Sequence, residues 1–332
     1  MTESTVATVR GDVPVTELGR TLMHKHIFTS TLEVTFNWPQ TFGHDDELIA
    51  LAAERLNAAA QVGIGTLVDL TVVGLGRYIP KIVRVASATA VNIVVATGVY
   101  VQTELPRYFQ WRGPETSIGG PEPLDDLFVH DIEVGIADTG VRAGILKCVS
   151  DHNGISPGVE RVLRATARAH RRTGVPIATH SAGPPTGLDQ QRIFESEGVD
   201  LSNVVIGHVG DTADMDYVQR LLDNGSFIGM DRFGIGTGFP FPEGHRDDQR
   251  RAATVAALCA RGYAEQIVLS HDAATQRDIT AGNPEMWFDA GSYTHLSVTI
   301  LPLLRELGVT EGQIETMMLQ NPARILQRTK AY

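Results

Sequence analysis

Pro176-Ile-Ala-Thr-His180 and Val204-Val-Ile-Gly-His208 are short apolar runs that each end on a histidine. Their β-branched, nearly continuous apolar character is typical of parallel strands that are buried on both faces. Three further runs also end on polar side chains: Thr21-Leu-Met-His24-Lys-His26, Ala143-Gly-Ile-Leu-Lys147 and Ile267-Val-Leu-Ser-His-Asp272. A parallel barrel carries its active site at the C-terminal ends of its strands. The five runs therefore aim four imidazoles, one amine and one carboxylate at a common point, a composition typical of metal-dependent hydrolases.

The rest of the chain predicts a (β/α)8 TIM barrel of the α/β class, formed by a single domain over residues 1–332. Helical apolar periods lie between the strand-like runs, and strands that alternate with helices indicate βαβ units. No GxGxxG dinucleotide motif follows the first strand, and a total of eight strands favours a closed barrel over an open sheet. The remaining strands are expected at 66–72, 92–98 and 226–231, and clear helices at 47–56, 158–170 and 250–258.

Long loops are expected after strands 3, 7 and 8. One runs from Tyr100 to about Leu127 and another from Ala273 to about Tyr293. Both follow strand C-termini and would lie over the mouth of the active site, where loops of this length usually serve as lids or binding loops. The segment from Thr310 to Arg328 is expected to form a closing helix.

Composition limits the class of protein. Hydrophobic residues make up 42% and charged residues 20%, which suits a large buried core. The net charge of −11, without a basic run, argues against nucleic acid or an anionic membrane as partner. Two cysteines, Cys148 and Cys259, exclude a disulfide framework and fit a reducing compartment. Met1–Arg10 lacks the apolar region of a signal peptide, so we expect a cytoplasmic protein.

The histidines are the first candidates for metal ligands. Side chains two apart on a strand point to the same face, so His24 and His26 face the barrel axis and Lys25 faces the helix layer. His180 and His208 end the adjacent fifth and sixth strands. Each alone would be read as a hydrogen-bonded core histidine, but together with an HxH pair they indicate a metal site. Neutral imidazole suits zinc, iron, cobalt or manganese.

Asp272 ends the eighth strand, which neighbours the first when a barrel closes. Its carboxylate can therefore approach the ion held by His24 and His26, and can accept a proton from a metal-bound water. The alternative is a helix N-cap, a role that Asp serves well. His271 points the opposite way and is interpreted as a supporting or structural residue.

Lys147 ends the fourth strand, where a bare ammonium would repel divalent cations. Two interpretations remain open. The side chain extends to solvent as a structural lysine, or its neutral amine has reacted with CO2 to form a carbamate. A carbamate is a bidentate anion, which would bridge two ions about 3.5–4 Å apart.

This set of residues resembles the amidohydrolase superfamily in its binuclear form with a carboxylated lysine. Flanking segments narrow the resemblance to the phosphotriesterase-like lactonases, over about Val9 to Arg328: Val68-Asp-Leu-Thr-Val-Val-Gly-Leu-Gly-Arg77, Ala96-Thr-Gly-Val-Tyr100, Gly144-Ile-Leu-Lys-Cys148 and Gly229-Met-Asp-Arg-Phe-Gly234. The resemblance implies two divalent ions, a carbamate on Lys147 and commonly a homodimer. It also implies a quorum-quenching enzyme that opens N-acyl-homoserine lactones and often has promiscuous phosphotriesterase activity. Lys25 departs from the family, which usually has Glu there.

The same resemblance assigns roles around the ions. A bridging hydroxide would attack the lactone carbonyl, Asp272 would take the proton, and Tyr100 would contact the substrate. Arg232 would shape the substrate mouth, and the apolar acyl channel would be lined by Leu75, Trp287 and Phe288. Without the family, these would be read as a rim tyrosine, a surface arginine and loop-packing residues.

Competing functions stay open at this stage. The main alternative is a primary phosphotriesterase or carboxylesterase on the same binuclear site. A mononuclear deaminase of the superfamily would not need the carbamate. A catalytically silent barrel would act as a binding or regulatory protein.

Overall fold

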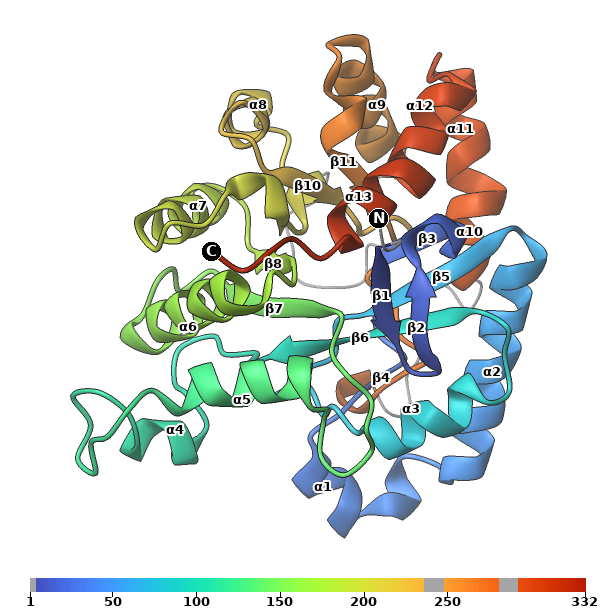
Figure 1. Ribbon diagram of the computed structural model, residues 1–332. Helices are drawn as coiled ribbons and strands as arrows, with labels where there is room; N and C mark the ends of the chain where they lie inside the picture. The colour runs from blue at the N-terminus through green and yellow to red at the C-terminus, as the bar shows by residue number, and fades with distance from the viewer. Residues whose placement is uncertain (1–3, 236–247, 281–291) are drawn as a thin grey trace.

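A barrel of eight parallel strands forms the centre of the computed structural model, which describes residues 4–235, 248–280 and 292–332 (Figure 1). The strands follow the order β11-β10-β9-β8-β7-β6-β5-β3. The two edges meet because Asp272 N donates to His24 O at 3.0 Å and His26 N donates to Ala273 O at 3.0 Å. The strands are β3 Arg20–Lys25, β5 Ile64–Asp69, β6 Asn92–Gly98, β7 Ile145–Ser150, β8 Ile177–Ser181, β9 Val204–Ile206, β10 Phe227–Met230 and β11 Ile267–Leu269.

Helices surround the barrel and cover the outer faces of its strands (Figure 1). Two long helical segments near the C-terminus each contain a π-helical turn, η8 Leu296–Ile300 and η9 Thr316–Gln320. The helices are α1 Leu32–Asn37, α2 Asp45–Gln61, α3 Ile79–Ala86, α4 Arg107–Trp111, α5 Pro123–Glu133, α6 Pro157–Thr173, α7 Thr186–Ser196, α8 Met215–Asp223, α9 Asp248–Ala260, α10 Ser292–His295, α11 Leu301–Glu306, α12 Glu311–Glu315 and α13 Asn321–Leu326.

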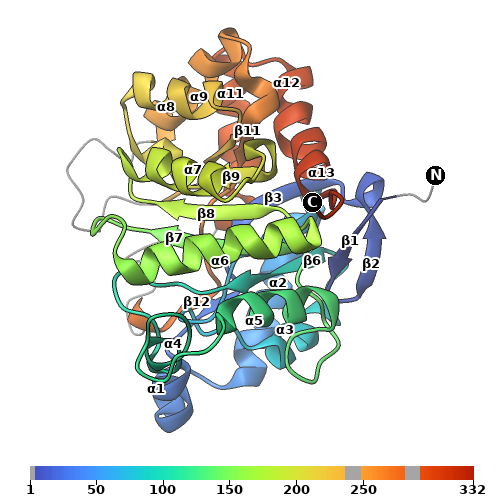
Figure 2. The same ribbon diagram turned by 60° about the vertical axis from the view of Figure 1, so that its left-hand side comes forward.

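Two short strand pairs lie at opposite ends of the barrel. The hairpin of β1 Thr5–Thr8 and β2 Gly11–Pro14 lies at the end where the barrel strands begin (Figure 2). At the other end, β12 Gln276–Arg277 pairs with β4 Phe28–Thr29. This second pair ties the segment after the eighth strand to the segment after the first, beside the C-terminal ends of the strands.

The core has two layers. Apolar side chains inside the barrel, among them Val68, Val94, Val205 and Val268, form one cluster, and a larger cluster fills the space between strands and helices. Above the inner apolar cluster the inward positions become polar, which leaves room for a chemical site at the C-terminal end. In β3 the pairing register shifts between Leu22 and Lys25, so Met23 joins the inner cluster although His24 also faces inward.

The predicted barrel and its eight strands are confirmed, as are the helices expected at 47–56, 158–170 and 250–258. The long segment expected from Tyr100 to about Leu127 follows β6, and it contains the short helix α4 and the start of α5 at Pro123. The glycines and prolines of this segment gave no sequence signal for the short helix. The closing helix begins after Thr310 and ends at Leu326, two residues before Arg328. Parts of the loops after strands 7 and 8, including Trp287 and Phe288, lie outside the described residues.

Within the described segments, no helix combines the length and the apolar character needed to cross a membrane.

Candidate metal centre

The C-terminal ends of five strands bring six candidate ligands together inside the barrel. Asp272 Oδ1 lies 3.3 Å from His26 Nε2 and 3.6 Å from His24 Nε2, and Asp272 Oδ2 lies 3.8 Å from His208 Nε2. His208 Nε2 is 3.0 Å from His180 Nδ1, and Lys147 Nζ is 3.4 Å from His24 Nε2. All six side chains are buried. The structure therefore places together the complete set that the sequence singled out.

The histidine rings are oriented by partners on the side away from this centre. Asp231 Oδ2 lies 2.8 Å from His24 Nδ1, and Asp231 Oδ1 lies 2.9 Å from His208 Nδ1. A carboxylate on one ring nitrogen fixes the tautomer and leaves the other nitrogen free to bind a metal. The Nε2 atoms of both rings consequently face Asp272.

His26 is held by a different partner, Thr71, whose Oγ1 lies 2.9 Å from His26 Nδ1. Thr71 follows β5, and its own backbone N donates to Asp69 Oδ1 at 3.0 Å. Neither Asp231 nor Thr71 was predicted from the sequence as an orienting residue. Asp231 ends a strand-like run and could have been found by the rule that found the ligands, whereas Thr71 carries no such signal.

Two of the candidate ligands also have an unusual backbone conformation. His208 and Asp272 adopt φ values of 63° and 51°, in the left-handed region that residues other than glycine rarely occupy. Such conformations cost about 1–3 kcal/mol each and cluster at functional sites. Glycines make room for the Asp231 carboxylate, because a Cβ on Gly229 would collide with Asp231 Oδ2 and one on Gly207 would lie 3.3 Å from it.

Electrostatics keep the imidazoles of His24 and His26 neutral. Burial, with the Lys147 charge, lowers the pKa of His24 to about 3, and burial lowers the pKa of His26 to about 4. Burial alone would raise the pKa of Asp272, but His208, His24 and other neighbours outweigh burial and hold that pKa well below its ordinary value. Neutral imidazoles and an ionised carboxylate are the forms that bind divalent metals.

Lys147 is enclosed in the centre, with 1% of its surface exposed. Its Nζ donates to Thr179 O at 2.8 Å, and burial lowers its pKa to about 8 despite the nearby Asp272. The interpretation as a lysine that extends to solvent is therefore wrong. A Cβ on Gly98 would collide with Lys147 O, so the glycine allows the two strands to approach closely here.

Arg232 contacts the centre directly. Its Nε donates to Asp272 Oδ2 at 2.9 Å and its Nη1 to Asp211 Oδ2 at 2.6 Å. Arg251 Nη2 donates to Asp211 Oδ1 at 3.1 Å, which extends the network away from the centre. Arg232 thus pairs with a candidate ligand, a contact that the sequence did not reveal.

Of the other side chains expected to contact the substrate, Tyr100 and Leu75 belong to the described residues. The Tyr100 ring packs edge-on against His180 with 5.7 Å between ring centroids, and burial raises the pKa of its phenol to about 12. Leu75 lies in a half-buried turn whose carbonyl accepts a hydrogen bond from Ser30 N. Trp287 and Phe288 fall outside the described residues.

Lys25 points away from the centre, as strand alternation requires. Its Nζ lies 4.0 Å from the centroid of the Tyr293 ring on α10, in the helix layer. Within the described chain, this fully buried nitrogen has no hydrogen-bond partner. The departure from the family at this position therefore changes the packing behind the histidine pair, without adding a cation to the centre.

The buried donor atoms fit divalent metal ions. Within the described residues, ligand atoms of His24, His26 and Asp272 lie within 4.8 Å of one another, and a second such group joins His24 and His208 to the orienting carboxylate of Asp231. Nitrogen and carboxylate donors at such spacing match the ligand chemistry of zinc and similar ions. A barrel with this set at the C-terminal ends of its strands has the architecture of a metal-dependent hydrolase.

Comparisons with known proteins agree with this class. Residues 4–326 match the model of the phosphotriesterase family. A phosphotriesterase homology protein of Mycobacterium tuberculosis is 50% identical over 330 residues, covering 98% of both chains. An aryldialkylphosphatase of Saccharolobus solfataricus is 38% identical over 316 residues, covering 93% of this chain and 95% of its own. The solved structure of the phosphotriesterase from Mycobacterium tuberculosis has a TM-score of 0.91 at 47% identity, covering 99% of this chain and 100% of that chain.

The chain belongs to the phosphotriesterase family. Members of this family are metal-dependent hydrolases that use a binuclear metal centre, and this chain is a metal-dependent hydrolase.

Proposed function

We propose that the protein opens the lactone ring of N-acyl-homoserine lactones on a two-ion centre. The ions would be held by six residues: His24, His26, Lys147, His180, His208 and Asp272. The observation that carries the proposal is the buried Lys147 amine, which lies among buried imidazoles, 3.4 Å from His24 Nε2. Two cations require a bridging anion there, and addition of CO2 to Nζ, with release of one proton, turns this amine into a carbamate.

The ions would be zinc, with iron, cobalt or manganese as alternatives that the same ligands accept. When bound, they would polarise the lactone carbonyl and lower the pKa of a bridging water. The remaining steps belong to side chains of the chain itself.

Asp272 serves as the proton acceptor in this proposal. Arg232 and the histidines keep it ionised, so a proton taken up in the attack is readily returned to the leaving alkoxide. Tyr100 keeps its phenol proton at neutral pH, because its pKa is about 12, and would donate a hydrogen bond to the oxyanion. Leu75, Trp287 and Phe288 would line the channel for the acyl chain.

A panel of lactones and aryl phosphotriesters tests this substrate assignment on metal-loaded protein. We expect higher kcat/KM for lactones, rising with acyl length by up to about fourfold per CH₂ until the channel is full, since each buried CH₂ contributes about 0.8 kcal/mol. Tyr100→Phe should retain metal and lower turnover, because only the hydroxyl is removed. If the protein hydrolyses phosphotriesters well and opens no lactone, the lactonase assignment is wrong. The proposed metal site is not affected by that result.

That outcome would favour the second candidate, a primary phosphotriesterase or carboxylesterase. Its support is the 38% identity with an aryldialkylphosphatase. A tetrahedral phosphorus centre resembles the intermediate of lactone opening, so one site would serve both reactions, and only the ratio of kcat/KM values separates them.

We also propose a cytoplasmic homodimer without nucleic-acid or membrane partners. The net charge of −11 and the two reduced cysteines support the location and the lack of such partners. The aromatic side chains Trp38, Tyr108 and Trp111 support self-association, because 57%, 57% and 47% of their surfaces are exposed. Light scattering coupled to size exclusion tests the dimer, and a monomer at micromolar concentration would contradict it.

A further inference from the structure

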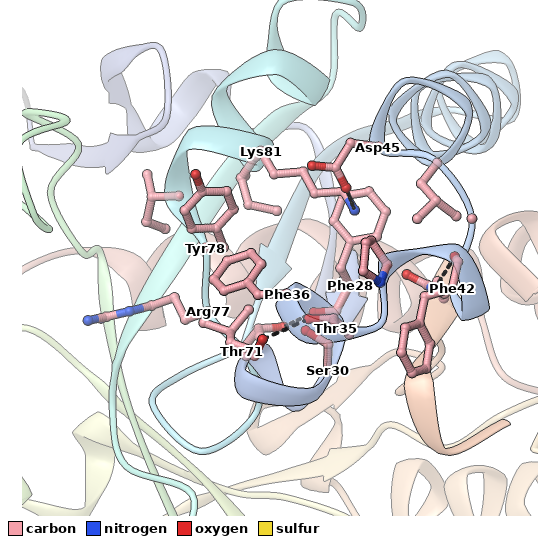
Figure 3. A pocket seen from close by; sticks show the side chains of 18 of the residues that line it. Phe28, Ser30, Thr35, Phe36, Phe42, Asp45, Thr71, Arg77, Tyr78 and Lys81 are labelled. Atoms are coloured by element: carbon pink, nitrogen blue, oxygen red, sulfur yellow. Dashed lines mark hydrogen bonds and ion pairs between the residues drawn. The ribbon is translucent and has the colours of Figure 1, made fainter. Parts of the chain in front are cut away.

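A cavity of about 220 Å³ lies outside the metal centre, between α1 and α2 on one side and α3 on the other (Figure 3). Its wall is formed mainly by apolar side chains from these helices and from β4 and β6. The lining residues include Phe28, Leu48, Thr35, Phe36 and Tyr78. None of the six candidate ligands lines it.

The cationic side chains Lys81 and Arg77 that line the cavity are already paired within the protein, and the Asp69 carboxylate is hydrogen-bonded to a backbone N–H. Lys81 Nζ bonds to Asp45 Oδ1 at 2.8 Å and also lies 4.2 Å from the centroid of the Phe28 ring. Arg77 Nη1 bonds to Asp131 Oδ2 at 2.7 Å, and Asp69 accepts the backbone N–H of Thr71. An anion would therefore lose its hydration without gaining an unpaired cation, and a cation would meet only a carboxylate that is already hydrogen-bonded. The lining favours a neutral, apolar ligand.

The size of the cavity limits the ligand further. An apolar cavity of roughly 150 Å³ is large enough to hold benzene. A cavity of about 220 Å³ therefore suits one substituted aromatic ring or a short alkyl chain. At the mouth, Phe36 and Tyr78 meet edge to face with 5.7 Å between ring centroids, which offers an aromatic contact to an entering ring (Figure 3).

Thr71 joins this cavity to the metal centre. Its side chain is part of the inner wall, and its Oγ1 is the atom that lies 2.9 Å from His26 Nδ1. The same hydroxyl also donates to Phe28 O at 3.4 Å, so it connects the cavity wall with the histidine. A ligand that contacts this wall would shift the Thr71 hydroxyl, which orients His26. Groups that orient a ligating histidine tune its metal affinity.

We propose that the cavity is a second binding site for a neutral aromatic or short alkyl molecule, coupled to the metal centre through Thr71. The site itself does not depend on the proposed function. The coupling depends on the proposed role of His26 as a ligand, so the two parts fail separately.

Fluorobenzene, observed by ¹⁹F NMR, is a suitable probe for the metal-loaded protein. We expect saturable binding that Thr35→Phe weakens at least tenfold, because the new ring fills the cavity from α1. Leu48→Phe fills it from α2 and serves as a second test if the first variant folds poorly. Val34→Phe adds the same ring on the neighbouring exposed position of α1, outside the cavity, and should leave the dissociation constant within twofold.

Charged probes test the ligand class. 4-Fluorobenzoate and 4-fluorobenzylammonium should bind at least tenfold more weakly than fluorobenzene. Equal binding of all three would overturn the assignment to neutral ligands. Absence of saturable binding, or equal binding to wild type and both filled variants, would overturn the site.

The coupling is tested by titrating fluorobenzene into the metal-loaded and the chelator-stripped protein. Coupling between two sites is reciprocal, so the dissociation constants should differ at least threefold. Thr71→Val, which removes the hydroxyl and keeps the shape, should bring the two constants together. Equal constants in the wild-type protein would overturn the coupling.

Discussion

Asp231 contacts two imidazoles at once, with one carboxylate oxygen on His24 and the other on His208. Its Oδ1 also accepts the backbone N–H of His208 at 2.9 Å. Burial would raise its pKa, but the two histidines lower that pKa far below the ordinary value, so the group is an anion throughout the working range. One residue thus sets the tautomer of two candidate ligands from different strands.

Asp231→Asn should lower metal affinity by about 10–100-fold, the usual effect of removing a partner of a ligating histidine. The amide has one acceptor oxygen and cannot serve both Nδ1–H groups. Competition with a chromophoric chelator measures the affinity. Asp214→Asn is the control, because Asp214 caps α8 through Tyr217 N and Asn caps helices equally well. Wild-type affinity in Asp231→Asn would contradict the orienting role.

Lys25→Met should leave metal content unchanged and stability equal or higher. The substitution removes a buried nitrogen that has no hydrogen-bond partner within the described chain and keeps an apolar stem against Tyr293. Elemental analysis and thermal unfolding measure the two quantities. Loss of bound metal would show that Lys25 supports the centre, and a large drop in the melting temperature would show that its contact with Tyr293 is stabilising.

At the scale of elements, the polar residue that ends each apolar run carried most of the correct predictions. The sequence predicted that His180, His208 and Asp272 lie close together, because the strand ends of a parallel barrel converge. Asp231 obeys the same rule, yet its partner His24 is 207 residues away, and no local pattern states that pairing. The helix α4 was not predicted, because it has only five residues and lies in a segment rich in glycine and proline.

The closing helical segment shows what a local signal can predict. Thr310 and Gln313 form a capping box, in which the Thr310 hydroxyl accepts Gln313 N–H and the Gln313 side chain accepts Thr310 N–H. Thr310→Ala should destabilise the protein by about 1 kcal/mol, whereas Thr310→Ser retains the cap and should cost much less. Urea unfolding measures both, and equal losses would show that the cap hydroxyl contributes nothing.

At the scale of the whole molecule, barrel closure assembles the centre. The Ser270 hydroxyl donates to His24 O at 2.6 Å, and Asp272 N donates to the same carbonyl, so the first and eighth strands meet at the ligands.

Burial in the protein interior also raises the pKa values of the two cysteine thiols. It raises the pKa of Cys148 to about 12 and that of Cys259 to about 11.

Because both pKa values lie well above 8, the two thiols stay protonated at pH 8 and should not react with a disulfide reagent while the protein is folded. Unfolding in guanidinium should expose two reactive thiols per chain. The absorbance of the released thiolate measures both states. A rapid reaction of one thiol in the native protein would contradict the closed packing around β7 or α9.

The proposed two-ion centre with a carbamate on Lys147 is best tested by native mass spectrometry of the metal-loaded protein. We predict a mass increase of two divalent ions and one CO2 per chain. In Lys147→Ala the CO2 and most of the metal should be lost, and short carboxylic acids should restore part of the metal. A chain that holds two ions with an unmodified Lys147, or that holds fewer than two ions at saturation, would contradict the proposed carbamate and two-ion centre.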